Sequence, residues 1–107
     1  MEIADFKAIL ESIDIPVVYH SFQASGMEVK QPPYLCWYVK ESNNIPGDDK
    51  VVSKFNRVNI ELYTDYKNPE LEKKLEDTLD SASIFYDKIE LYIKEEKMFE
   101  ILYEIEI

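Results

Sequence analysis

Residues 55–82 constrain the fold of this chain more strongly than any other stretch. From residue 55 to residue 66 the sequence alternates, and one side of an extended chain would carry Val58, Ile60, Leu62 and Thr64. The other side would carry Arg57, Asn59, Glu61, Tyr63 and Asp65. Alternation over this length is typical of a β-strand with one buried face and one wetter face. We therefore predict a strand at 55–66 with its apolar face in the core.

A helix is predicted directly after this strand. Asn68 can accept a hydrogen bond from a free backbone N–H, and Pro69 has no N–H to leave unpaired in the first turn. An apolar stripe follows at intervals of three or four residues, made of Leu71, Leu75, Leu79 and Ala82. We interpret the acidic side chains of the same helix as a solvated face, namely Glu72, Glu76, Asp77 and Asp80.

The rest of the chain predicts one more helix and four more strands. The spacing of Ile3, Phe6, Ile9, Leu10 and Ile13 predicts a helix at 2–13. Strands are predicted at 17–22, 34–40, 84–93 and 98–107, with a loop at 23–33. In the strand at 84–93 we expect Ile89, Leu91 and Ile93 to point into the core.

This order of elements predicts a single α+β domain spanning residues 1–107. Five strands form an antiparallel or mixed sheet, and both helices pack on one face of it. A chain of 107 residues is large enough for one hydrophobic core.

The segment at 42–50 holds the densest group of turn-forming residues in the chain. It contains Asn43-Asn44, Pro46-Gly47 and Asp48-Asp49, which predicts a long, polar and mobile connection between two neighbouring strands. Two interpretations remain open, a plain surface loop or a contact for a partner. In the second case the contact residues would be Asn43, Asn44, Asp48 and Asp49.

Charge excludes some classes of function. Acidic residues outnumber basic residues 22 to 12, and the formal net charge is −10. Such a chain does not attract a phosphate backbone, so free nucleic-acid binding is disfavoured. No run approaches the ~20 apolar residues of a membrane-spanning helix, and the first residues lack the basic start of a signal peptide. We expect a cytoplasmic chain without a membrane partner.

Catalytic and metal-binding patterns are missing from the sequence. His20 is the only histidine, and no spacing supplies it with metal-binding partners, so we interpret it as structural or surface-exposed. Cys36 lies in an apolar strand and is interpreted as a small core residue. No carboxylate lies in an apolar run that would clearly raise its pKa. We therefore predict no catalytic residue, no metal, no cofactor and no enzyme activity.

Aromatic residues suggest protein contacts. Several tyrosines fall on the strand faces away from the predicted helices, where either core packing or a partner could explain them. On the strand at 55–66, the residues that would contact another subunit or a partner are Arg57, Asn59, Glu61 and Tyr63. The residues alone predict a non-catalytic assembly protein.

The whole chain resembles a known family. The pattern consists of VVYH at 17–20, PPYLCWYV at 32–39, FNRVNIELYT at 55–64 and NPEL at 68–71, followed by a closing hairpin. In this pattern the chain is similar to the tail terminator proteins of long-tailed phages and prophages, also called tail completion or tail-to-head joining proteins. The resemblance implies that the second and third strands lie side by side and that the following helix packs on them.

The resemblance also implies a function. Members of the family form a ring, commonly a hexamer, that caps the tail tube and ends its polymerisation. The partners would be other copies of the chain, the tail tube protein and the head connector or stopper, with DNA only passing through the lumen. An acidic lumen would repel the DNA backbone and let it slide. The protein would be assembled in the host cytoplasm and reside in the tail or neck of the virion.

Two other functions fit the same sequence. Another neck or head-closure component of a phage would share this small α+β design. A small acidic immunity or inhibitor protein would use its carboxylates to cover a basic enzyme site.

Overall fold

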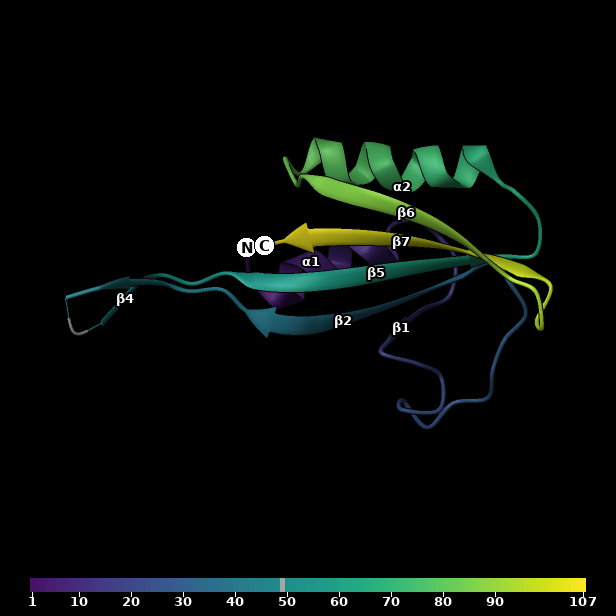
Figure 1. The fold of residues 1–107 in the computed structure, drawn as a ribbon, viewed down its shortest axis with the longest axis horizontal. Coiled ribbons are helices and arrows are strands. Elements are labelled where there is room, and N and C mark those ends of the chain that lie inside the picture. Colours follow the sequence, from purple (N-terminus) through teal and green to yellow (C-terminus); the bar gives the residue numbers. More distant parts are fainter. Residues whose placement is uncertain (49) are drawn as a thin grey trace.

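The computed structural model describes residues 1–48 and 50–107, and it contains two helices. These are α1 (Ile3–Glu11) and α2 (Pro69–Ser81). The main sheet is formed by β1 (Val17–Tyr19), β2 (Tyr34–Ser42), β5 (Asn56–Thr64), β6 (Tyr86–Ile93) and β7 (Met98–Glu106). A separate two-stranded sheet is formed by β3 (Ile45–Gly47) and β4 (Lys50–Ser53). Figure 1 shows the arrangement.

The main sheet is mixed, with the strand order β1-β2-β5-β7-β6. β1 pairs with β2 in parallel, and the other neighbours pair antiparallel. β5 lies in the middle, between β2 and β7. The predicted α+β class and the predicted order of helices and strands are confirmed. The predicted strand at 17–22 is shorter than expected and ends at Tyr19, because His20 adopts a left-handed backbone with φ 66°.

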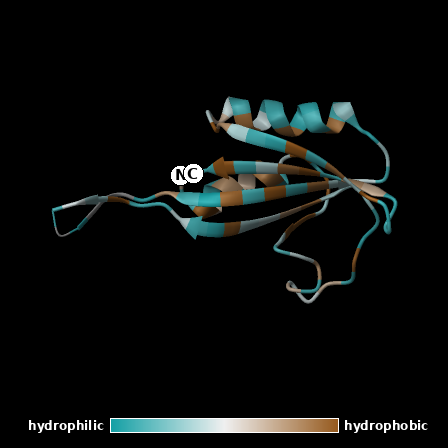
Figure 2. Ribbon diagram, in the orientation of Figure 1, coloured by the Kyte–Doolittle hydropathy of each residue, from teal (hydrophilic) through white to brown (hydrophobic). Residues whose placement is uncertain are grey.

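The core lies between the helices and one face of the sheet. Phe6 and Leu10 of α1 and Leu75 and Leu79 of α2 are buried against the inward side chains of β2, β5 and β7. On β5 these are Val58, Ile60, Leu62 and Thr64, so the predicted core face of this strand is confirmed. Figure 2 shows the resulting alternation of hydrophobic and hydrophilic residues along the strands.

The predicted start of α2 is also confirmed. The Asn68 side chain accepts a hydrogen bond from the backbone N–H of Leu71 at 3.2 Å, and Pro69 occupies the first turn. Because the cap fixes where the helix begins, it also fixes which residues face the sheet. Among the described residues, neither helix has the length and apolar character needed to cross a membrane.

A smaller cluster lies on the other face of the sheet. Val18, Phe22, Tyr34 and Cys36 are buried there, and Tyr63 packs against them. This cluster explains why β2 carries large side chains on both faces. Cys36 is a buried free thiol, as the sequence indicates.

Two predictions of orientation are wrong. Ile89 and Leu91 are 43% and 46% exposed, and Ile93 lies on the same face of β6. The reason is that this strand turns its polar side, including Lys88, toward α2. Glu72 is only 3% exposed and does not belong to a solvated face. Both errors have one cause, which is that ionic contacts between α2 and β6 occupy a place where apolar packing was expected.

The predicted loop at 42–50 contains regular structure instead. β2 continues to Ser42, and β3 and β4 then pair antiparallel, with Gly47 opposite Lys50 and Ile45 opposite Ser53. We call residues 43–48 and 50–55 the arm. The molecule measures 51 × 30 × 24 Å along its principal axes. The arm extends away from the sheet along the longest of these axes (Figure 1).

Candidate functional site

The four contact residues predicted on β5 lie together on the face of the sheet opposite the helices. We call this surface the open face; on β5 it carries Arg57, Asn59, Glu61 and Tyr63. The strand register adds residues from both neighbouring strands: Tyr38 and Glu104 beside Asn59, Cys36 and Leu102 beside Glu61, and Tyr34 and Glu100 beside Tyr63. The alternation of β5 therefore identified one continuous surface.

Arg57 and Asn59 differ in how far their side chains are exposed to solvent. Nη1 of Arg57 donates to Oε1 of Glu41 at 2.8 Å, and Nε lies 3.7 Å from Oε2 of Glu106. About half of the Arg57 side chain remains exposed. Asn59 is only 8% exposed, and its Nδ2 donates to the Tyr38 hydroxyl at 2.9 Å. Arg57 is therefore accessible to a partner, whereas Asn59 orders the surface around it.

The predicted contact residues of the arm have separate places. Nδ2 of Asn43 donates to Oε2 of Glu106 at 2.8 Å, which brings Asn43 close to Arg57. Oδ1 of Asn44 accepts from the backbone N–H of Phe55 at 3.3 Å. These two asparagines fasten the base of the arm. Asp48 is exposed after β3, and Asp49 lies outside the described residues.

The open face contains a pair of carboxylates around one phenol. The Tyr63 hydroxyl lies 3.2 Å from Oε2 of Glu61 and 3.1 Å from Oε1 of Glu100. A phenol carries one proton, so Tyr63 can donate to only one of the two carboxylates at a time. The second carboxylate is left with a like charge beside it.

Burial and this neighbouring charge raise the pKa of Glu61 above its ordinary value of 4.5. Burial is the larger cause, and the charge of Glu100 adds to it. Burial also raises the pKa of Cys36 to about 11 and raises the pKa of Tyr63. The sequence indicated no carboxylate in an apolar run that would clearly raise its pKa, and Glu61 departs from this expectation. Its burial in the folded sheet and the pairing of β5 with β7, which brings Glu100 beside it, are not visible in the sequence.

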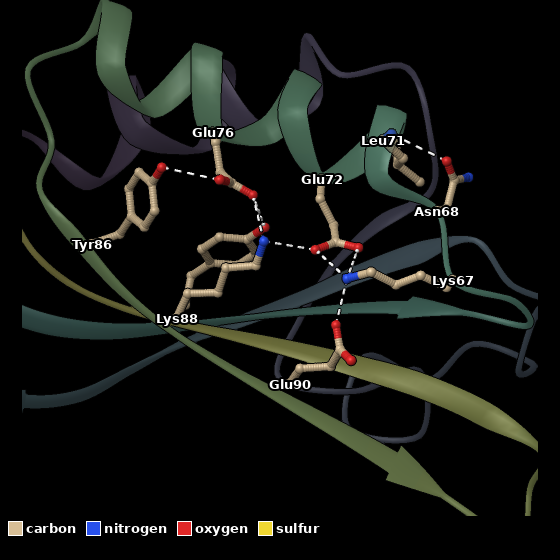
Figure 3. Close-up of polar contacts among 9 residues, drawn as sticks. Lys67, Asn68, Leu71, Glu72, Glu76, Tyr86, Lys88 and Glu90 are labelled. Carbon is tan, nitrogen blue, oxygen red and sulfur yellow. Dashed lines mark hydrogen bonds and ion pairs between the residues drawn. The ribbon is translucent and has the colours of Figure 1, made fainter.

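The covered side of the sheet holds a second ionic group, which we call the helix-side cluster. Figure 3 shows Lys67 and Lys88 directed at Glu72, and the distances from Nζ to the carboxylate oxygens are both 2.7 Å. Lys88 also reaches Glu76 at 3.0 Å. The members of the cluster are Lys67, Glu72, Glu76, Tyr86, Lys88, Glu90 and Tyr103.

This cluster has the opposite effect on its carboxylates. Burial alone would raise the pKa of Glu72, but the hydrogen bonds and charges of Lys67 and Lys88 outweigh burial and lower it. The pKa of Glu76 is lowered in the same way, against burial, by hydrogen bonds from Tyr103, Lys88 and Tyr86. The helix-side cluster therefore gives these carboxylates cations and hydroxyl donors as partners, and it holds α2 on β6.

His20 lies beside the open face, with its ring 5.6 Å from the Tyr38 ring between centroids, and its charge acts to lower the pKa of Glu61 against the larger effects of burial and Glu100. His20 is exposed, and its Nδ1 lies 3.3 Å from Oγ of the adjacent Ser21. A groove of about 660 Å³ lies elsewhere on the open face, beside Arg57, Phe85, Asp87, Glu104 and Glu106. Within the described parts of the chain, no three His, Cys, Asp or Glu side chains gather as a metal site requires.

Sequence reasoning missed part of this surface. The apolar side chains of β6 and β7 that lie on the open face are Ile89, Leu91 and Leu102. They adjoin Glu100, which pairs with Tyr63 across the strands. The alternation of both strands was visible, but the direction in which β6 faces was not.

A search of protein-family models found no model that matches this chain, and a search of curated proteins also found no match. The function is therefore inferred from the fold and from the residues of the arm and the open face.

Proposed function

We propose that this chain is a phage tail terminator, an assembly protein that caps the tail tube as a ring, ends tail polymerisation and joins the tail to the head connector. The observation that carries this proposal is the arm. A two-stranded hairpin by itself is marginally stable in water, yet this one extends away from the core with Ile45 51% exposed. Such a hairpin gains stability when it lies on a neighbouring protein.

The fold supports the same proposal. β2 and β5 pair side by side, as the resemblance to tail terminators implies. Leu75 and Leu79 of α2 lie in the same hydrophobic core as the inward side chains of these strands. The polar contacts of α2 with the sheet are with Tyr86 and Lys88 of β6 and with Tyr103 of β7.

Charge supports the proposed passage of DNA through a ring. The chain has a formal net charge of −10, with 22 acidic residues against 12 basic ones. A lumen lined by carboxylates repels phosphates, so DNA slides through it without binding. The partners would be other copies of the chain, the tube protein and the connector or stopper. The site of action would be the tail or neck of a virion after assembly in the host cytoplasm.

The proposal is tested by mixing the protein with tail tubes and measuring the size of the species formed. Chemical cross-linking followed by light scattering should give a ring-sized oligomer that depends on the tubes. A monomer at high protein concentration, in the presence of tubes, would contradict the proposal.

Shortening the arm tests whether attachment of the protein to tail tubes depends on the arm. We replace residues 44–54 with a two-residue Asn-Gly turn, which closes β2 on β5. Thermal stability should change by no more than a few degrees, because the arm lies outside the core, while attachment to tubes should be lost. Full attachment by the shortened protein would show that binding of the ring to tubes does not depend on the arm.

A further inference from the structure

Arg57 of the open face pairs with Glu41 and Glu106, but two other carboxylates of this face have no cation beside them in the part of the chain that the structure describes. Glu100 contacts Tyr63, and Glu104 is exposed; neither makes an ion pair with another described residue. Between them on the same face of β7 lies Leu102. On β6, Ile89 pairs with Leu102 and Leu91 pairs with Glu100, and both are large apolar side chains with more than two fifths of their surface exposed. This part of the open face is therefore an apolar strip bordered by two carboxylates.

The arm carries two lysines whose charge is opposite to that of these carboxylates, and Asp48 and Asp49 precede the first of them. Lys50 opens β4 and Lys54 follows its last residue, and both lysines are exposed. Neither makes an ion pair with any other described residue. The two lysines are four positions apart, as are Glu100 and Glu104. In extended strands, four positions span about 13 Å, so both pairs of charges have the same separation.

The arm cannot reach the open face of its own chain, because it extends away from the sheet (Figure 1). We propose that the arm of one copy lies along β7 on the open face of the next copy, with Lys50 and Lys54 paired with Glu100 and Glu104. The lysine at Glu100 places a permanent positive charge beside the Glu61–Tyr63–Glu100 group.

This contact joins two different surfaces of the same protein, and such head-to-tail contacts build closed rings when the rotation between copies closes. The inference deepens the proposed function, and it rests on the ring in that function. It assigns the occupant of the open face, which is a second copy of this chain.

Zero-length carbodiimide cross-linking tests the contact directly on the unmodified protein. The reagent joins a lysine to a carboxylate only when the two groups touch. In concentrated protein, with and without tail tubes, peptide mass spectrometry should find Lys50 or Lys54 joined to Glu100 or Glu104 of another copy. Lysines of the arm joined instead to tube protein, or to no carboxylate of the open face, would overturn the proposal.

Charge reversal tests the same contact by mutation. Lys54→Glu and Glu104→Lys should each weaken self-association roughly tenfold, and the double variant should recover to within about threefold of wild type. Both positions are exposed, so the fold should be unaffected. Lys30→Glu and Glu70→Lys are matched controls, since they change net charge by the same amounts at exposed positions in the loop before β2 and at the start of α2, and they should associate as wild type does.

The outcomes separate this inference from the proposed function. Rings on tubes without the arm-to-β7 cross-links would overturn the inference and leave the function standing. Cross-linked oligomers that never bind tubes would support the inference and overturn the function. If a single reversal and its control weaken association equally, or the double variant shows no recovery, the pairing is wrong.

Discussion

The two faces of the sheet shift the pKa values of their carboxylates in opposite directions. On the helix side, Glu72 and Glu76 are held by Lys67, Lys88 and tyrosine hydroxyls, and their pKa values are lowered. On the open face, Glu61 and Glu100 share a single phenol, and the pKa of Glu61 is raised.

The difference shows which face is complete in a single chain. Burying a charge is costly unless a partner of opposite charge lies beside it, and the helix-side cluster supplies that partner within the molecule. On the open face, Arg57 pairs with Glu41 and Glu106, but Glu100 and Glu104 have no such partner among the described residues. A cation from outside would therefore stabilise these two carboxylates. This contrast makes the open face the side on which a second protein gains most by binding.

The largest expected effect comes from removing apolar packing on the helix side. Leu75→Ala should lower the free energy of unfolding by about 2–5 kcal/mol, because Leu75 is buried in the core. Ile89→Ala on the open face should cost less than about 1 kcal/mol. Urea unfolding of both variants at low micromolar concentration gives the two values, and equal losses would remove the distinction between the faces.

The same substitution should have unequal effects in the two carboxylate groups. Glu72→Gln removes the negative charge between Lys67 and Lys88, and at neutral pH it should cost about 1.5–3 kcal/mol. Glu61→Gln removes a charge that Glu100 repels, and it should be neutral or slightly stabilising. Denaturant unfolding at pH 7 compares the two, and a loss in Glu61→Gln as large as in Glu72→Gln would contradict the account.

The smallest expected effect is a difference in pH dependence. Because the pKa values of Glu72 and Glu76 are lowered, their contribution to stability is present above pH 4.5 and is lost as the pH falls through their folded values. The pKa of Glu61 is raised, so its contribution is present below pH 4.5 and is lost as the pH rises through its folded value.

Unfolding free energies measured from pH 3 to pH 8 separate these contributions. Glu72→Gln should flatten the loss of stability in acid. Glu61→Gln should instead remove a decline in the free energy of unfolding that the wild type shows as the pH rises above 4.5. An unchanged profile in both variants would mean that these groups do not control the pH dependence.

The unit formed by β5 and α2 could be predicted because local signals agree. Strict alternation over β5 and the Asn68-Pro69 start of α2 point to the same packing, which the buried Leu75 confirms. The orientation of β6 could not be predicted, because both of its faces carry large side chains. Its helix-facing side is chosen by the pairing of Lys88 with Glu72 and Glu76, which lie in a different element.

The candidate site could be predicted only in part for a similar reason. The alternation of β5 identifies Arg57, Glu61 and Tyr63 as one face, but the carboxylate pair also requires Glu100. Glu100 reaches Tyr63 through the register of β5 and β7, and no local pattern specifies that register. The arm was missed as a hairpin since β3 has only three residues and includes Pro46.

Electron microscopy of tail tubes mixed with this protein tests the central claim most directly. The wild-type protein should form a ring at one end of each tube, and the tubes should stop growing in the presence of free tube protein. The arm-shortened protein should leave the tube ends bare. Bare tube ends and continued growth with the wild-type protein would contradict the account.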